Sequence, residues 1–383
     1  MKEVYFDNAA TTKIDEKVLH EMLPYFDEKS GNASSMHLKG QEAKNAVEKA
    51  REIIAKSINA KTQEIIFTSG GTESNNLALK GLFFANYPEK NHIITTKIDH
   101  DCVLNSCKWL EAQGAEVTYL NVDDEGFINL KEFEDSITKK TILVSVIHGN
   151  NEIGIIQDLQ AIGEICRKKG ILLHTDACQS YTKVMINVKK QNIDLATLNA
   201  HKIHGPKGVG ALYIREGIKI IPLLHGGGHE RKMRSGTENV TGIVGFGKSV
   251  EISDKKDIEK MSRLRDKLIE GILELPNVKL NGSREKRLCN NINISFNNIE
   301  GEALGGYLER FGIYTSTGSA CSSHSLESSH VLKAIGLRPL QANSSLRITI
   351  SKYTTEEEIN YFLKVLPKVV SKLRMLSPFQ IHK

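Results

Sequence analysis

The stretch IIFTSGGTESNNLALKGL, residues 65–82, joins a short apolar run to a helix-length segment through two adjacent glycines. Its first residues are typical of a buried strand, and the residues from Thr72 to Phe84 predict a helix. Glycines let the backbone approach a ligand closely, and unpaired amides at a helix start bind anions such as phosphate. Strand–glycine–helix turns also occur where only tight packing is required, so this stretch by itself leaves both interpretations open.

The same alternation of apolar runs and helix-length segments extends from about residue 60 to residue 250. Strands are expected in the runs HIITT, TILVSVI, GILLHTD, IDLATLN and GALYI, and another helix is expected over residues 159–169. Because this alternation builds crossover units, it predicts an α/β fold with a mostly parallel sheet covered by helices. Ligands in that architecture gather at the carboxyl ends of the strands.

A second, smaller domain is expected after this region. In DIEKMSRLRDKLIEGILELP, residues 257–276, the apolar positions repeat at helical spacing up to the proline. Strands are then expected in NNINISF and SSLRITIS, with helices over residues 302–310 and near the end of the chain, which is an α+β pattern. We therefore expect a large domain over residues 15–255 and a small domain formed by residues 1–14 and 256–383.

The composition of the 383-residue chain, 40% hydrophobic and 25% charged, is ordinary for a globular protein with a large core. Its 51 basic and 46 acidic residues are mixed along the sequence, so no basic block indicates nucleic-acid binding. No apolar stretch is long enough for a membrane span, and no signal peptide is expected. Six cysteines form neither a regular disulfide framework nor a CxxC pair, which favours a reduced, cytoplasmic setting.

The stretch GILLHTDACQS, residues 170–180, ends a predicted strand at Asp176, and Gln179 follows three residues later. A partly buried carboxylate needs a positive or hydrogen-donating partner. The same residue type also caps the start of a helix. Asp176 is therefore predicted either as a cap or as the partner of a protonated heterocyclic nitrogen.

In LNAHKIHGPKGVG, residues 198–210, Lys202 follows another predicted strand. A lysine held in a pocket can lose its proton and form a Schiff base with a carbonyl. A pyridine aldehyde that carries a phosphate needs an anion nest, an acid at its ring nitrogen and an imine-forming lysine. Gly71 and Thr72, Asp176 and Lys202 supply this set at strand ends, so together they indicate pyridoxal 5′-phosphate.

These elements belong to a longer series of stretches that resembles the cysteine desulfurases of the NifS/IscS type, in the class V aminotransferase family of fold type I pyridoxal-phosphate enzymes. The matching stretches run in the family's order from residue 5 to about residue 360. They are YFDNAATT, GNASSMH, FTSGGTESNN, HGNNEIGIIQD, HTDACQS, HKIHGPKGVGALY, HGGGHERKMRSGTENV, STGSACSS, SSLRITIS and YTTEEEI. Because the series covers nearly the whole chain, the resemblance implies the fold type I architecture of a large domain and a smaller one.

The resemblance also implies a role for each matching residue. Lys202 matches the Schiff-base lysine, Asp176 the partner of the pyridine nitrogen, and Gln179 the contact to the phenolic oxygen. His100 matches the histidine that stacks on the ring and shuttles protons, and Cys321 matches the catalytic cysteine. The other matching positions bind the phosphate (Gly71, Thr72, Asn199, His201 and, from the neighbouring subunit, Thr237), the substrate carboxylate (Arg347), or both cofactor and substrate (Asn151).

The implied activity is the conversion of L-cysteine to L-alanine through a pyridoxal-phosphate ketimine and a persulfide on Cys321. The stretch TSTGSACSSHSLESS, residues 315–329, is rich in small polar residues and is expected to be a mobile loop that carries this thiol. The resemblance further implies a homodimer that delivers sulfur to an iron–sulfur scaffold protein or another persulfide acceptor, or to tRNA thiolation. Selenocysteine lyase and a non-catalytic sulfur-transfer partner are the alternatives, although intact Lys202 and Cys321 argue against the second.

The sequence departs from the family pattern at three positions. Asn199 stands where the family commonly has a phosphate-binding serine, Asp99 replaces the usual glutamate before His100, and Ala33 replaces a proline. An amide at residue 199 can still donate a hydrogen bond, so only that phosphate contact is left open. In HGGGH, residues 225–229, the glycines disfavour the helix that would pair the two histidines on a metal, and no metal site is expected.

Overall fold

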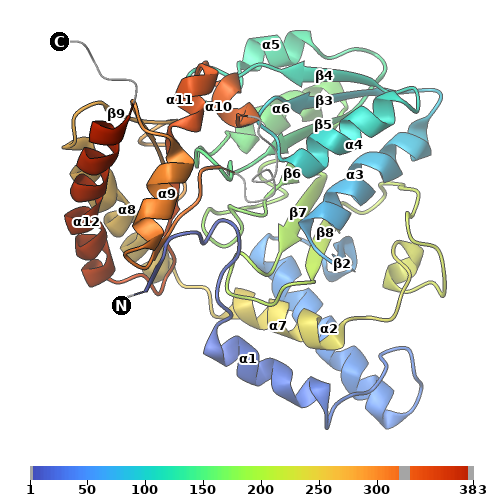
Figure 1. Cartoon of the computed structure of the whole chain (residues 1–383). Coiled ribbons are helices and arrows are strands. Elements are labelled where there is room, and N and C mark those ends of the chain that lie inside the picture. The colour runs from blue at the N-terminus through green and yellow to red at the C-terminus, as the bar shows by residue number, and fades with distance from the viewer. Residues whose placement is uncertain (1–2, 319–327, 378–383) are drawn as a thin grey trace.

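The structure is a computed structural model that describes residues 3–318 and 328–377. Within these ranges, seven strands form a central sheet in the order β2-β8-β7-β6-β5-β3-β4 (Figure 1). Of these seven, β8 alone is antiparallel to its neighbours β2 and β7, so the predicted mostly parallel sheet is confirmed. The strands are β2 (Ile65–Thr68), β3 (His92–Thr96), β4 (Glu116–Leu120), β5 (Thr141–Ile147), β6 (Leu172–Asp176), β7 (Leu195–Asn199) and β8 (Gly210–Ile214).

Helices cover both faces of this sheet because successive residues of each strand point to opposite sides. In β2, Ile65 and Phe67 belong to the core on one side, whereas Ile66 belongs to the core on the other. The first core is closed by α2 (Leu38–Ser57), α6 (Leu159–Lys169) and α7 (Val240–Glu251), with α1 (Glu16–Met22) against α7 and α5 (Leu130–Asp135) against α6. The second core is closed by α3 (Gly71–Asn86) and α4 (Asp101–Glu111).

The predicted smaller α+β unit contains a three-stranded antiparallel sheet in the order β12-β10-β9. Its apolar core includes Val4 and Phe6 near the amino terminus, which contact residues from the last third of the chain. The expected division after residues 14 and 255 remains a proposal. The elements of this unit are β1 (Val4–Tyr5), α8 (Lys255–Leu273), β9 (Val278–Leu280), β10 (Asn291–Phe296), α9 (Gly301–Glu309), β11 (Ile313–Tyr314), β12 (Ser345–Thr349) and α12 (Glu356–Leu376).

Two short helices, α10 (His330–Ala334) and α11 (Pro339–Asn343), return the chain to the large sheet. Val331 and Leu332 of α10 are fully buried against Ile98 and Ile153, which follow β3 and β5. The segment that follows residue 327 is therefore fixed next to the carboxyl edge of the large sheet.

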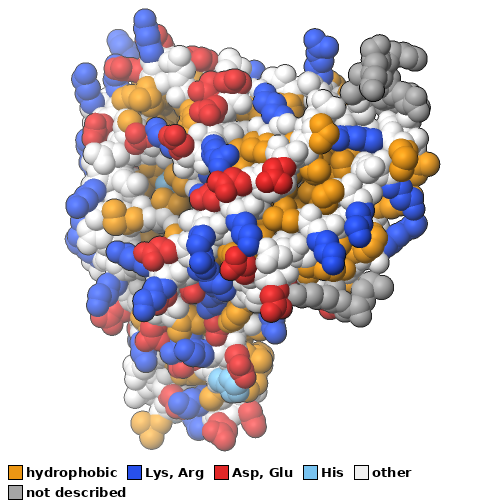
Figure 2. Space-filling view, turned by 90° about the vertical axis from the view of Figure 1, so that its left-hand side faces the viewer, with side chains coloured by type: hydrophobic (Ala, Val, Ile, Leu, Met, Phe, Trp, Pro, Cys, Tyr) orange, Lys and Arg blue, Asp and Glu red, His pale blue; other side chains and the backbone are white. Residues whose placement is uncertain are grey.

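Acidic and basic side chains are mixed on the surface, as they are along the sequence. On the side formed by the carboxyl-terminal elements, acidic and basic side chains are interspersed with apolar ones (Figure 2). Among the described residues, no helix is long and apolar enough to cross a membrane, and no group of three or more histidine, cysteine or acidic side chains gathers as metal ligands would. The two histidines of HGGGH thus belong to no such group.

Candidate active site

The carboxyl ends of β2, β6 and β7 meet at one edge of the large sheet. Both β2 and β7 are antiparallel to β8, so they point the same way, and Thr68 and Asn199 at their ends both pair with Gly210. Strand β6 is parallel to β7 and its last residue, Asp176, pairs with Thr197. This is the edge at which α/β proteins bind ligands, and three of the predicted functional stretches begin there.

Helix α3 begins at this edge with its first amides free. Gly70, the residue before the helix, has φ 154° and offers no side-chain cap, and in the described chain nothing accepts the amides of residues 71–73. A Cβ on Gly71 would lie 2.6 Å from the Cys178 sulfur, so only glycine fits between the helix start and the turn after β6. The 16-residue helix has free amides at its start, and the backbone at Gly71 lies close to the turn after β6. This arrangement is suited to hold a phosphate.

Asn199 lies beside this helix start. Its Nδ2 atom is 3.7 Å from the position that a Cβ on Gly71 would take, and its buried Oδ1 atom has no partner among the described residues. His201 follows two residues later, and burial together with the charges of Lys202 and Lys207 lowers its pKa to about 4. A neutral His201 offers one ring N–H as a donor.

Thr237 is exposed, and no described contact joins it to the amides of α3 or to His201. The stretch that carries it is nevertheless attached to α3, because Arg234 forms an ion pair with Glu73 at 2.8 Å. The phosphate contact expected of Thr237 from a neighbouring subunit remains a prediction.

Asp176 is a buried carboxylate held by donors. Its Oδ2 accepts a 2.7 Å hydrogen bond from Asn75 Nδ2, and its Oδ1 accepts a 2.9 Å hydrogen bond from the Cys178 amide. Burial would raise the pKa of Asp176, but nearby His100 and these two donors outweigh burial and lower it. An ionised carboxylate in the interior is suited to a cationic partner such as a protonated ring nitrogen.

His100 begins α4 and faces the same carboxylate. Its Nδ1 accepts from the Cys102 amide at 3.2 Å, so the proton of the neutral ring is on Nε2. Burial, followed by the charge of Lys202, lowers the pKa of His100. The Cys102 sulfur lies 3.0 Å from both His100 Nδ1 and Asn75 Nδ2, and it links the histidine to the amide that holds Asp176.

Lys202 follows the end of β7, and its charge lowers the pKa of both His100 and His201. These are the two histidines expected at the ring and phosphate ends of the cofactor. The preceding carbonyl, that of His201, accepts hydrogen bonds from the amide and the hydroxyl of Thr12 at 2.9 and 2.8 Å. Gln179 is buried, and its Nε2 donates to the Ala9 carbonyl at 2.9 Å.

Arg347 enters the site from the middle of β12. Its Nη2 donates to Asp7 Oδ1 at 2.8 Å and its Nη1 to the Asn151 carbonyl at 3.1 Å. Its Nε is buried and has no partner among the described residues. A guanidinium held in this way keeps donor capacity for a carboxylate, which is the role expected for residue 347.

Cys321 and His324 lie outside the described residues, but the chain on each side of them is attached to the site. Ser316 exchanges two main-chain hydrogen bonds with Arg347. On the other side, the Ser329 hydroxyl donates to Glu152, whose pKa is raised by burial, and His330 Nε2 contacts the carbonyl of Asp99 at 3.0 Å.

Sequence reasoning missed four residues that position the predicted ones: Asn75, Cys102, Asp7 and Glu152. Each lies inside or next to a stretch already singled out, but its partner is more than twenty residues away in the sequence. A buried polar residue requires a partner, so a polar side chain on an otherwise apolar helix face was the available signal for Asn75.

The donor set fits pyridoxal 5′-phosphate. The free amides of α3 and the amide of Asn199 suit its phosphate, the ionised Asp176 suits a protonated ring nitrogen, and Lys202 supplies a primary amine to its aldehyde. The residue types at this edge thus match the chemistry of the cofactor's phosphate, ring nitrogen and aldehyde.

Comparison with known proteins agrees with this assignment. The model of the aminotransferase class-V family matches residues 4–362. Two curated proteins named "Cysteine desulfurase IscS", from Clostridium botulinum (strain Hall) and Methanosarcina thermophila, are each 51% identical over 98% of this chain, which is 96% and 94% of their lengths. The solved structure "NIFS-LIKE PROTEIN" superposes with a TM-score of 0.92 at 42% identity, over 97% of this chain and all of that one. The structure "SspA in complex with cysteine" has a TM-score of 0.83 at 38% identity, over 92% of this chain and all of that one.

Proposed function

The chain belongs to the class-V aminotransferase family and is a pyridoxal-phosphate-dependent cysteine desulfurase, and from this premise we propose how its residues divide the reaction. L-cysteine is the substrate, L-alanine is released, and the sulfur passes to Cys321. The observation that carries this assignment is the gathering of Asp176, His100 and Lys202 at one sheet edge, with Arg347 in a hydrogen-bond network that reaches the segment after β5.

When bound, pyridoxal phosphate withdraws electrons from the substrate and so makes its α and β bonds breakable. Lys202 attaches the cofactor and then serves as the base for the α proton. Asp176 keeps a positive charge on the ring nitrogen, because its own pKa is held low. Neutral His100, with its proton on Nε2, moves a proton at the substrate thiol.

Arg347 binds the substrate carboxylate, assisted by Asn151. The Asp7 carboxylate and the Asn151 carbonyl fix the guanidinium plane before substrate arrives, so little conformational freedom is lost on binding. The carbon–sulfur bond of cysteine breaks as its sulfur forms a bond to Cys321, which leaves a persulfide on the enzyme and a proton on the β carbon of alanine.

Cys102 is the competing thiol, since it lies 3.0 Å from His100 Nδ1. Burial, followed by the charge of Asp176, raises the pKa of Cys102 to about 12. The thiolate is the nucleophile in sulfur chemistry, so a thiol that keeps its proton at neutral pH is a poor acceptor. We therefore assign the persulfide to Cys321.

The test uses the purified, cofactor-loaded protein and L-cysteine with a reductant, with alanine and sulfide measured together. Lys202→Ala should abolish covalent attachment of the cofactor. Cys321→Ser should retain the cysteine-dependent spectral change and lose sulfide release, whereas Cys102→Ser should release sulfide. Mass spectrometry should find the persulfide on the peptide that contains Cys321, and its recovery on Cys102 instead would overturn this assignment. Faster turnover of selenocysteine than of cysteine would favour the lyase alternative.

A homodimer is part of the proposal. Thr237 is exposed and free of its own chain's phosphate site, which supports its use by a second copy. Large apolar side chains near α2 are exposed as well, among them Met36 at 92% and Leu38 at 83%. A cytoplasmic location is proposed from the five free cysteines of the described chain, and an iron–sulfur scaffold or another protein thiol is proposed as the acceptor.

A further inference from the structure

Lys183, in the turn after β6, is a partly buried lysine that the reaction as described does not use. Burial lowers its pKa to about 8, and among the described residues no carboxylate forms an ion pair with it. An ammonium that is partly withdrawn from water and has no counter-charge costs free energy, so its retention needs another reason. The contacts of its Nζ atom supply one.

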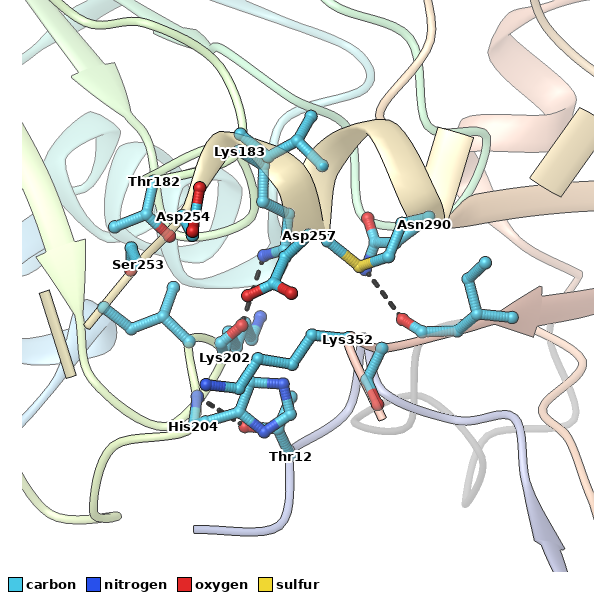
Figure 3. A pocket seen from close by; sticks show the side chains of 15 residues that line it. Thr12, Thr182, Lys183, Lys202, His204, Ser253, Asp254, Asp257, Asn290 and Lys352 are labelled. Carbon is cyan, nitrogen blue, oxygen red and sulfur yellow. Dashed lines mark hydrogen bonds between the residues drawn. The ribbon is translucent and has the colours of Figure 1, made fainter. Parts of the chain in front are cut away.

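The Nζ atom of Lys183 donates to two main-chain carbonyls. One is that of Gln179, at 2.9 Å, and the other is that of Lys202, at 3.1 Å (Figure 3). Among the described residues, no other donor reaches either carbonyl. One carbonyl belongs to the turn after β6 and the other to the turn after β7. Lys183 thus joins the two turns that carry the predicted ring contact and the cofactor-attaching lysine.

The surroundings of Lys183 give it no ligand to bind. The cavity it lines has a volume of about 40 Å³, which is room for one or two waters. Thr12 and Lys352 line the same cavity, and Lys352 forms an ion pair with Asp15. Metabolite-sized molecules are excluded, so the two carbonyls are the partners that account for the ammonium.

We propose that Lys183 is a positioning residue for Lys202 and Gln179. Thr12 fixes the carbonyl of His201 through two hydrogen bonds, and Lys183 fixes the next carbonyl, that of Lys202. Because two consecutive carbonyls are held by hydrogen bonds, rotation of the peptide of Lys202 is restricted, which favours one direction for its side chain. The positive charge of Lys183 also disfavours an additional positive charge on a cofactor attached through this turn.

This inference rests on the proposed function, and it is tested on the cofactor-loaded protein. In Lys183→Met, the pH midpoint of the bound cofactor's absorbance change should rise by roughly half a unit to one unit, because a neighbouring positive charge is removed. The kcat for alanine formation should fall about tenfold or more, because the attaching lysine loses its fixed direction. Lys183→Arg keeps the charge and donors, and should restore the midpoint.

Lys352→Met is the matched control, since it removes a lysine from the same cavity that contacts neither carbonyl. It should lower thermal stability and leave the midpoint unchanged. If Lys183→Met does not fold, Lys183→Gln, which keeps one donor without the charge, should show the same upward shift. If Lys183→Met is active and has the same midpoint and kcat as the wild type, the role proposed for Lys183 is wrong, but the proposed function is not affected. If the wild-type protein itself forms no alanine from L-cysteine, the proposed function is wrong.

Discussion

The two sheets of the molecule contribute to the site in different ways. The seven-stranded sheet places Asp176 at the end of a strand, and Lys202 shortly after the end of the next one. The three-stranded sheet instead places Arg347 in the middle of β12, between the buried apolar residues Leu346 and Ile348. A side chain at the end of a strand reaches the ligand site through the sheet topology alone. A charged side chain in the middle of a buried strand also needs hydrogen-bonding or ionic partners.

Those partners come from far away in the sequence. Arg347 is bound by Asp7, near the amino terminus, and by the carbonyl of Asn151 after β5. The mid-strand arginine therefore ties the small sheet to both the first residues and the large sheet. Substitution of a strand-end residue such as Asp176 should thus lower kcat. Substitution of the mid-strand Arg347 should instead weaken substrate binding and the contacts between the two sheets.

The largest effect is expected from Asp176→Asn. The amide retains the size of the side chain but removes the charge that holds a proton on the ring nitrogen, so kcat should fall by about 10³-fold. Asp194→Asn is the matched control, because Asp194 is also a buried aspartate of this sheet but lies before β7 and pairs with Arg215. That variant should lose stability while its cofactor-loaded form keeps a near-normal kcat. Equal losses of kcat in both variants would contradict a special role for the carboxyl edge.

Arg347→Lys should produce a smaller loss that falls on substrate binding. A lysine cannot reproduce the planar, multidentate contacts to Asp7, the Asn151 carbonyl and a substrate carboxylate, so kcat/KM for L-cysteine should fall by about 10²-fold. Steady-state kinetics should show most of this change in KM. Arg287→Lys is the control, because Arg287 is equally buried but donates to main-chain carbonyls. If both variants lost only thermal stability and kept the KM of the wild type, Arg347 would have no special role in substrate binding, and the contrast drawn between the two sheets would be wrong.

Much of the large sheet could be predicted because its strands are short apolar runs, buried on both faces, and its helices follow glycine turns or caps. The helix predicted over residues 159–169 has those bounds in the structure, where Asp158 caps its start and Gly170, with φ 68°, ends it. The helix expected over residues 72–84 extends from Gly71 to Asn86. Helix α2, by contrast, was not predicted, because its many charged residues give a weak periodic signal.

The site itself was predictable where function depends on a strand end or on the family resemblance, as for Asp176 and Lys202. It was not predictable where two side chains meet across the fold. Nothing local in the sequence pairs Asn75 with Asp176, or Glu152 with Ser329, because those contacts exist only after the sheet and the segment 328–343 have packed. The roles of the predicted site residues remain predictions, and the variants described here test those of Asp176, Lys202, Cys321 and Arg347.

Acid should destabilise the large sheet before the small one. Burial lowers the pKa of His148 and His174 in the large sheet's interior from 6.5 to about 4. Because their folded pKa values are depressed, their contribution to stability is complete above pH 6.5 and is lost as the pH falls toward 4, by up to about 1.4 kcal/mol per pH unit for each histidine. Urea unfolding followed by the fluorescence of Trp109, the sole tryptophan, should report this loss.

The control for the acid effect is His174→Gln, which can keep hydrogen bonds to Ser145 and Thr197 without a titrating ring. Its stability should depend less on pH between 6.5 and 4 than that of the wild type. Amide hydrogen exchange should show earlier loss of protection in β6 than in β10, because the small unit has no buried histidine among its described residues. Simultaneous loss in both strands, with an unchanged pH slope in the variant, would contradict this explanation.

The smallest effect is expected at Thr182, where the backbone beside Lys183 is strained. Thr182 has φ 62°, a left-handed conformation that a β-branched residue adopts at a cost, whereas the positive-φ non-glycine residues of the small unit, Asn277 and Asn298, are of a type that tolerates it. Thr182→Gly should relieve about 1 kcal/mol of strain, partly offset by the greater freedom of glycine in the unfolded chain, so the Tm should rise by roughly 1 °C. Asn277→Gly, at φ 56°, should give a smaller gain. A larger gain at Asn277 would mean that strain is not concentrated at the carboxyl edge, and the contrast between the two sheets would then be one of chemistry alone.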